Sequence, residues 1–211
     1  MRILVLVHEF PPIGGGGGRV AEDICRGLAK RGHEIKVLTS HIKGLPRKEE
    51  RDGFQIFRLR SARKQSYRAS FLSMAFYVLA GFWAGLRFSK HWRPDLIHVH
   101  FAVPAGALAW ILFKLTGIPY VLTSHLGDVP GGVPEKTKGW FRYVYPFTPL
   151  IWKDASRVVV VSRYTRQLAE QHYKVPMEVI PNGIDLTLGN QGPLTIHNPP
   201  RIMFAGRCVS Q

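Results

Sequence analysis

Short apolar runs, most of them rich in β-branched residues, alternate with longer segments of helical period along this chain. The apolar runs predict strands at residues 2–7, 34–39, 55–59, 96–99, 120–123, 157–161 and 178–180. Several are apolar at almost every position, which is typical of strands covered on both faces. Strands that alternate with helices predict an α/β fold with a doubly wound, mainly parallel sheet.

The strand pattern breaks after residue 180. Residues 181–200 are mostly polar and contain several Gly and Pro residues, whereas residues 201–206 begin a new apolar run. We therefore expect a first domain at residues 1–180, a linker at 181–200 and the start of a second domain at 201–211.

The composition is that of a folded domain, with 45% hydrophobic and 20% charged residues. Lys and Arg total 29 against 14 Asp and Glu, and the resulting charge of +15 favours partners that carry phosphates, anionic lipids or nucleic acid. A nucleic-acid binder would interleave its basic residues with exposed aromatic residues, whereas most aromatic residues here fall in apolar runs. We therefore expect no nucleic-acid partner.

Two features predict a cytoplasmic protein. Cys25 and Cys208 lie far apart and have no CxxC or His/Cys neighbours, so neither a disulfide framework nor a zinc site is indicated. Residues 1–7 form a short apolar run without a small-residue cleavage site, which indicates a strand and not a signal peptide.

Five consecutive glycines, residues 14–18, lie between the first predicted strand and the first predicted helix. Glycine lets a backbone approach a phosphate closely, so this run is a candidate anion-binding loop, to which Arg19 would add a charge. The alternative is a turn without a ligand. A nicotinamide dinucleotide site is disfavoured because Arg19 replaces the third glycine of that motif, and because Thr39-Ser40 stand where an acidic residue would hold the ribose.

Histidines follow two further strands. His98 and His100 fall on one face of a strand, which suggests a metal pair, but no third ligand is evident nearby and we expect no metal site. His100 ends its strand and is the better placed of the two for a ligand. His125 and Asp128 lie three residues apart on a Gly-bearing loop and could hydrogen-bond a polyol such as a sugar, the alternative being a purely structural role.

Seven short motifs occur in the order in which they stand in the GT4 family of retaining glycosyltransferases, and the chain resembles that family from residue 1 to residue 207. The motifs are Pro11-Pro12 before the glycine run, residues 28–37, residues 94–100, Ser124-His125, Val161-Ser162, residues 180–185 and residues 204–207. The resemblance implies a GT-B architecture of two Rossmann-like domains, which hold the acceptor and the sugar nucleotide on either side of a cleft.

The resemblance also assigns roles to residues. It implies that Gly15 and Gly16 approach the diphosphate of the donor, that Arg207 binds the same diphosphate, and that His125 contacts the transferred sugar as the catalytic histidine. The partners implied are a nucleoside diphosphate sugar as donor substrate and a sugar or lipid-linked acceptor, with no separate cofactor. Glu9, His100 and Asp128 are the candidate acceptor contacts.

Part of the family pattern falls beyond residue 211. The lysine expected soon after Arg207 and an E-x7-E segment that holds the donor would both follow Gln211. We therefore expect the chain to lack most of the donor domain and to be poorly active alone. The alternative is a module that binds a sugar phosphate or another anion without catalysis.

An apolar segment suggests contact with a membrane. Residues 69–86 are uncharged and long enough to raise a transmembrane helix, but the strand pattern on both sides argues against a span. The segment could be buried on the sheet. We favour peripheral binding to an anionic membrane surface, because residues 43–68 carry nine cations, Arg58 and Arg63 among them, against three acidic residues.

Overall fold

The computed structural model describes residues 1–66, 69–133, 141–183, 199 and 201. Its centre is one eight-stranded sheet in the order β3-β4-β2-β1-β5-β6-β7-β8. All neighbouring strands are parallel except β3 and β4. The strands are β1 (Arg2–Leu6), β2 (Glu34–Ser40), β3 (Lys48–Arg51), β4 (Phe54–Leu59), β5 (Leu96–His100), β6 (Tyr120–Ser124), β7 (Arg157–Val160) and β8 (Glu178–Val179).

Seven of these strands confirm the predicted ones, and each predicted end lies within one residue of the observed end. The strand that the pattern missed is β3, whose sequence Lys-Glu-Glu-Arg contains no apolar residue. It pairs antiparallel with β4 at the edge of the sheet, with Glu49 opposite Ile56. Charged residues at an edge strand discourage pairing with further strands. Because β3 is charged for this reason, a search for apolar runs does not detect it.

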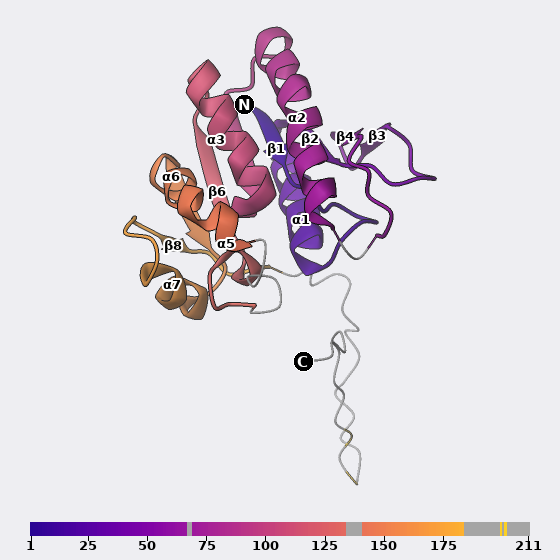
Figure 1. Ribbon diagram of the computed structural model, residues 1–211. Coiled ribbons are helices and arrows are strands. Elements are labelled where there is room, and N and C mark those ends of the chain that lie inside the picture. Colours follow the sequence, from indigo (N-terminus) through magenta and orange to yellow (C-terminus); the bar gives the residue numbers. More distant parts are fainter. Residues whose placement is uncertain (67–68, 134–140, 184–198, 200, 202–211) are drawn as a thin grey trace.

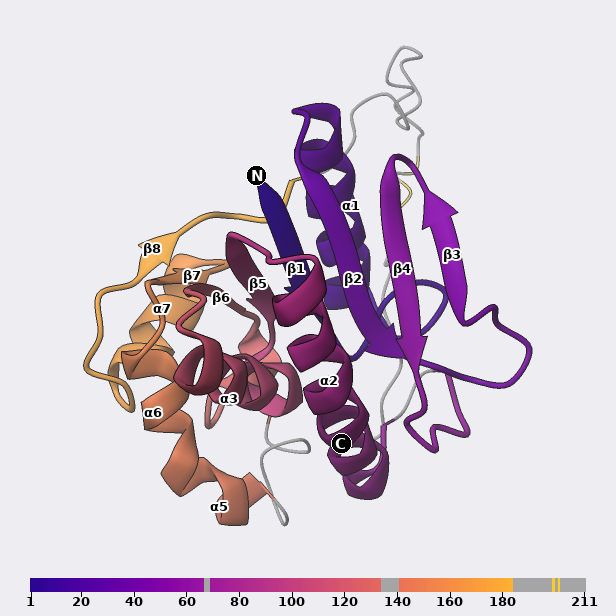
Figure 2. The same ribbon diagram turned by 90° about the horizontal axis from the view of Figure 1, so that it is seen from above.

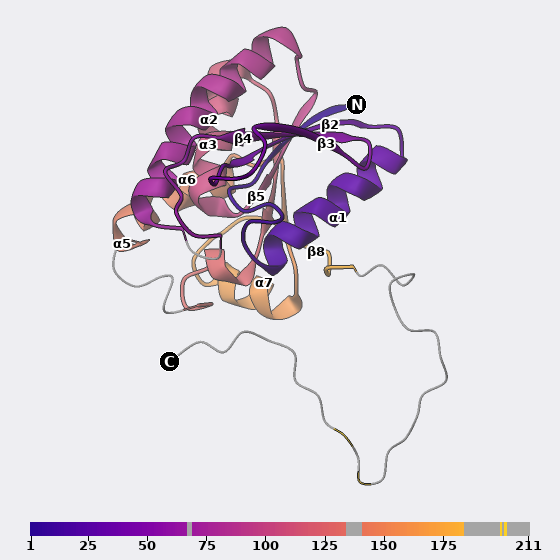
Figure 3. The ribbon, with the colours of Figure 1, turned by 90° about the vertical axis from the view of Figure 1, so that its right-hand side faces the viewer.

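Helices cover both faces of the sheet, as Figure 3 shows: α1 lies on one face, and α2, α3 and α6 lie on the other. The bounds are α1 (Gly16–Lys30), α2 (Phe71–His91), a π-helical turn (Ala102–Gly106), α3 (Ala107–Thr116), α5 (Phe141–Val144), α6 (Thr148–Lys153) and α7 (Arg163–Glu170). Two short 3-10 turns occupy Leu126–Asp128 and Tyr145–Phe147.

Strand β1 shows why the central strands are apolar throughout. Leu4 and Leu6 belong to the core beneath α2 and α3, whereas Ile3 and Val5 belong to the core beneath α1. Successive side chains of a strand point to opposite faces, so a strand between two helical layers needs apolar residues at every position. The predicted doubly wound α/β fold is therefore confirmed.

Helices α2 and α3 lie side by side (Figures 1 and 2) and approach each other closely at two glycines. A Cβ atom at Gly81 would lie 2.4 Å from Leu108, and one at Gly85 would lie 2.5 Å from Leu112. Glycine at both positions therefore permits this close contact, which directs one face of α2 into the core and leaves the opposite face to solvent.

The order of the strands along the sheet reverses at β1, which pairs with β2 on one side and with β5 on the other (Figure 2). Ligands of open α/β sheets bind beyond the carboxyl ends of the strands at such a reversal. The residues that follow β1, β5 and β6 are therefore the ones to examine for a site.

Candidate functional site

The glycine run is only partly a loop. Helix α1 begins at Gly16 with Gly15 as its N-terminal cap, so the last three glycines form its first turn. A Cβ atom at Gly17 would lie 2.4 Å from the ring of Phe101, and one at Gly18 would lie 2.6 Å from the carbonyl oxygen of Glu9. Gly16 instead faces open space. Glycine at 17 and 18 thus permits close packing, while the exposed start of the helix stays accessible to an anion.

Two histidines from neighbouring strands meet beside this helix start. His100, the last residue of β5, and His125, which follows β6, lie 3.5 Å apart between Nδ1 and Nε2. The ring of Phe101 packs on His125 at 4.6 Å between centroids and on His8 at 5.2 Å. Phe101 therefore connects the first turn of α1 with the loop after β6.

Two histidines of β5, His98 and His100, have lowered pKa values. His100 is completely buried, and burial together with the neighbouring histidines lowers its pKa well below 6.5. Burial, followed by the charge of His125, lowers the pKa of His98 to about 4. His98 Nε2 lies 2.8 Å from the hydroxyl of Thr123. The two rings share one face of the strand as predicted, and no cluster of three or more potential metal ligands occurs in the described ranges.

Asp128 fixes the turn that carries His125. Its Oδ2 accepts a hydrogen bond of 3.1 Å from the backbone N–H of His125, and the side chain of His125 in turn accepts one from the N–H of Asp128. This reciprocal cap closes the 3-10 turn after β6. Asp128 is 5% exposed, and its carboxylate already accepts a hydrogen bond from the protein. Its contact with the acceptor stays a prediction.

Phe101 adopts a backbone conformation that is rare for its residue type, with φ at 72°. A bulky residue in this region costs about 1–3 kcal/mol, and such strain is concentrated at functional sites. The conformation turns the chain from β5 directly into the π-helical turn and places the aromatic ring between His8 and His125. The sequence gives no signal for it beyond the position of Phe101 after a strand.

Glu9 lies against the glycine run. A Cβ atom at Gly14 would lie 2.5 Å from the Cβ of Glu9, and Gly14 has φ at 93°. Oε1 of Glu9 accepts a hydrogen bond of 3.1 Å from Arg63. Arg19, expected to add charge to an anion site, donates to Glu22 at 2.6 Å, and its side chain is 65% exposed.

Two of the nine cations counted at residues 43–68 do not face solvent. The side chain of Arg58 has no exposed area and that of Arg63 is 1% exposed. Both guanidinium groups face the turn after β1 and not solvent, with hydrogen bonds to the carbonyl oxygens of Pro11 and His8. These two arginines therefore cannot contact a membrane surface in this fold.

The candidate site residues from the sequence thus converge on one edge of the sheet. Glu9 and Gly16 lie at the turn after β1, His100 lies at the end of β5, and His125 and Asp128 follow β6. Gly15 caps the same helix as Gly16. The predicted diphosphate ligand Arg207 lies outside the described residues, as do most of the predicted linker and second domain. Sequence reasoning missed Phe101 and Arg63.

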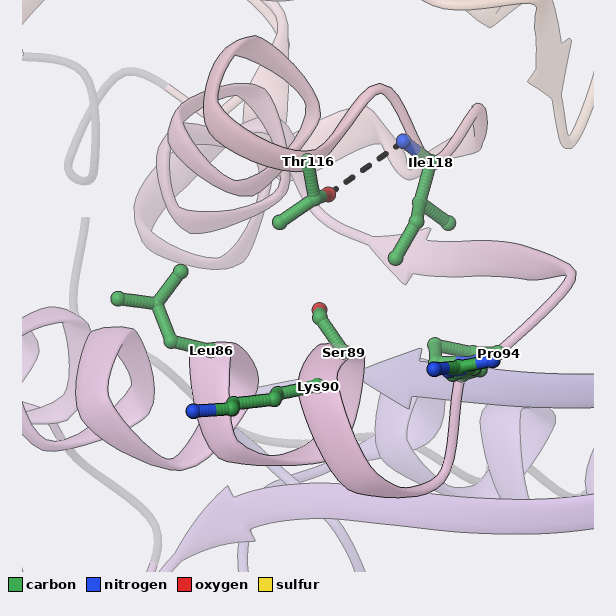
Figure 4. Close-up of a pocket in the computed structure, with 7 residues that line it drawn as sticks. Leu86, Ser89, Lys90, Pro94, Thr116 and Ile118 are labelled. Atoms are coloured by element: carbon green, nitrogen blue, oxygen red, sulfur yellow. Dashed lines mark hydrogen bonds between the residues drawn. The ribbon is translucent and has the colours of Figure 1, made fainter.

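Two hollows beside helices α1 to α3 lie away from this edge in the described part of the chain. One of about 530 Å³ is formed at the amino ends of the strands by α2, α3 and the turns that follow them, with Lys90 and Thr116 in its lining (Figure 4). The N–H of Ile118 donates a hydrogen bond of 3.4 Å to the Thr116 hydroxyl there. The other, of about 600 Å³, lies between α1 and strands β5 to β7, and His98 contributes to its lining. Neither contains His125 or Glu9.

The family model of Glycosyltransferase Family 4 matches residues 14–188 of the chain. The chain belongs to this family. The match covers the helix start, the histidine group and the turn of Asp128, and it bears out the resemblance that the sequence motifs carry.

Individual relatives agree. The chain is 26% identical to the glycogen synthase of Mycobacterium tuberculosis over 235 aligned positions, which cover 98% of this chain and 54% of that protein. It is 33% identical to the 2-deoxystreptamine N-acetyl-D-glucosaminyltransferase of Streptomyces fradiae over 127 positions, or 56% of this chain and 29% of that one. The chain thus spans about half the length of the first of these relatives and less of the second.

A solved structure matches the fold. The sucrose-phosphate synthase of Thermosynechococcus elongatus superimposes with a TM-score of 0.73 at 21% identity, covering 89% of this chain and 49% of that one. At this level of identity the comparison supports the Rossmann-like fold of this family 4 chain and not a particular substrate.

Proposed function

We propose that the protein carrying this chain is a retaining glycosyltransferase, which moves a sugar from a nucleoside diphosphate donor to an acceptor. The observation that supports this most directly is the juxtaposition, in a family 4 chain, of an accessible glycine-led helix start with His125 at one edge of the sheet. A helix start suits the diphosphate, and a histidine beside it suits the sugar bound to that diphosphate.

The roles divide between two elements. The amides of residues 16 and 17 precede the first hydrogen bonds of α1 and lie where negative charge develops on the departing diphosphate. His125 contacts the transferred sugar. Asp128 fixes the backbone of His125 through a hydrogen bond, and the ring of Phe101 packs on the imidazole. Glu9 contacts the acceptor from the other side of the helix start, and Arg207 adds a second contact to the diphosphate.

The test is sugar transfer from a panel of nucleotide sugars, with His125 replaced. Because His125 is 8% exposed and packed, His125→Asn is a better probe than His125→Ala, which would also leave a cavity. We expect His125→Asn to lower kcat/KM by about 10-fold or more, or about 1.4 kcal/mol of transition-state stabilisation. The exposed His91→Asn is the matched control. If neither the unaltered chain nor the protein that carries it transfers sugar, although the donor binds, the result would favour a non-catalytic anion-binding module.

We also propose that the protein works at the cytoplasmic face of an anionic membrane, on a lipid-linked acceptor. Support comes from a stripe of apolar side chains along the outer face of α2, with Leu72 62%, Leu79 58% and Trp83 66% exposed. The stripe continues at helical spacing into the exposed cations Arg87 and Lys90, which complement an anionic surface. Within the described ranges, α2 is the one helix long and apolar enough to span a membrane, but it packs on α3, β2 and β4 as part of the domain.

Vesicle sedimentation tests the membrane proposal. Anionic phosphatidylglycerol vesicles should retain the protein at low salt, and a Leu79→Gln/Trp83→Gln variant should lose most of this binding. Leu115→Gln on α3 is the control, because Leu115 is 60% exposed but lies outside the stripe. Equal retention of all three proteins, or none by the unaltered protein, would refute the proposal.

A further inference from the structure

Two buried arginines reach the turn after β1 from the segment that follows β3. Arg58 lies in β4, and its Nη2 donates to the carbonyl oxygen of Pro11 at 3.1 Å. Its Nη1 lies 2.9 Å from a carboxylate oxygen of Glu49 in β3. Arg63, five residues further along, donates to the carbonyl oxygen of His8 at 3.4 Å. One short backbone segment is thus held at two points by side chains that come from about 50 residues away.

Arg63 makes the larger set of contacts. Its Nε donates to the carbonyl oxygen of Gln65 at 2.9 Å, and its Nη2 donates to the carbonyl oxygen of Ser66 and to Oε1 of Glu9, both at 3.1 Å. Together with the bond to His8, one guanidinium group engages three carbonyls and one carboxylate. Only arginine carries donors in a planar fork that can serve so many acceptors at once.

The contacts of Arg63 connect directly to the helix start. The carbonyl oxygen of Ser66, which Arg63 holds, also accepts a hydrogen bond of 2.7 Å from the N–H of Gly14. The side chain of Glu9, which Arg63 also holds, lies against Gly14, and the backbone carbonyl of Glu9 lies against Gly18. A change in the guanidinium position therefore reaches both ends of the glycine run.

Burial makes this arrangement sensitive to the charge of Arg63. The guanidinium is nearly removed from water, so its hydrogen bonds must be satisfied within the protein, and Glu9 is the carboxylate that pairs with it in the part of the chain that the structure describes. A charged pair of this kind fixes geometry more than it adds stability. The same residue would otherwise be a mobile, solvated cation on a loop.

We propose that Arg63 is a positioning residue of the glycosyl-transfer site. It fixes the turn of residues 8–14, and with it the carboxylate of Glu9 and the start of α1, in the geometry that receives donor and acceptor. This inference rests on the proposed transfer function for its catalytic consequence, whereas the ordering of the turn is a property of the chain itself.

Hydrogen–deuterium exchange on the 211-residue chain tests the ordering directly, without any substrate. Arg63→Gln should speed exchange of the Gly14 amide about 10-fold or more, while amides of β5 and β6 keep their protection. Arg60→Gln is the matched control, since Arg60 is exposed in the same segment. Glu9→Gln should reproduce the effect more weakly, and it provides a second test should Arg63→Gln fail to fold.

Kinetics of the protein that carries this chain test the catalytic consequence. Arg63→Gln should lower kcat/KM for the acceptor about 10-fold or more, and Arg63→Lys, which keeps the charge and fewer of the bonds, should recover part of the loss. Unchanged exchange at Gly14, exchange raised equally across the whole sheet, or full activity of Arg63→Gln would overturn the proposal. Absence of transfer by the unaltered protein would count against the proposed function, and the exchange result would still decide whether Arg63 orders the turn.

Discussion

Replacing Gly18 with alanine probes the closest packing contact at the site. A Cβ atom there would lie 2.6 Å from the carbonyl oxygen of Glu9 and 3.1 Å from its carbonyl carbon. Non-bonded heavy atoms prefer separations of about 3.5 Å, so the helix start and the turn after β1 must separate by nearly 1 Å. Both groups are backbone, and no side-chain rotation can relieve the overlap.

The expected cost follows from two opposing effects. Overpacking of a fixed contact costs about 1–3 kcal/mol, whereas exchanging glycine for alanine in a helix recovers at most about 1 kcal/mol. With about 1 kcal/mol recovered, the net loss in the free energy of unfolding is about 0–2 kcal/mol. For a chain of this length each kcal/mol corresponds to about 2–4 °C, so Tm should fall by up to about 8 °C.

Gly16→Ala supplies the control, because it is the same substitution in the same helical turn. A Cβ atom at Gly16 meets nothing within 4 Å, so this variant should be unchanged or more stable by at most about 1 kcal/mol. Thermal and urea unfolding followed by circular dichroism measure both. Equal stability of the two variants, or a gain for Gly18→Ala, would refute the packing of α1 on Glu9 described above.

Two further outcomes are expected. Acidification should destabilise the fold between about pH 6.5 and pH 4. In this range the unfolded chain binds protons at His98 and His100, whereas the folded chain does not, because folding lowers the pKa of His98 to about 4 and also lowers the pKa of His100. The loss is at most about 1.4 kcal/mol per pH unit for each histidine, and urea titrations from pH 7 to pH 4 measure it; a flat profile would contradict it. Asp128→Ala should cost about 1–3 kcal/mol of stability by leaving the buried N–H of His125 without this acceptor, and should lower transfer as well. Unchanged unfolding of this variant would remove the role given to Asp128.

The sequence by itself determined the framework. The apolar runs predict seven of the eight strands, because a strand between two helical layers must be apolar on both faces and this requirement is written in consecutive residues. The glycine run after the first strand and the histidines after later strands likewise placed candidate residues at the carboxyl edge of the sheet. These are local patterns, and the parallel connection of the strands is enough to bring them together.

The tertiary structure decided how individual polar groups are used. Nothing near Arg58 or Arg63 in the sequence distinguishes them from the exposed cations around them, since their acceptors at Pro11, His8 and Glu9 come from another part of the chain. Burial of a charge is set by whether distant partners can satisfy it, and only the fold assembles those partners.

The same reason explains the remaining differences. The charged strand β3 forms because the edge of β4 has backbone groups free to pair with it. The hydrophobic pattern of the sequence contains no sign of this pairing. The carboxylate of Asp128 binds the backbone of His125, and the ring of Phe101 fills the space that glycine leaves at residue 17. Local sequence sets which backbone segments form, whereas contacts between segments far apart in the chain set which side chains face a ligand and which ones hold the site in place.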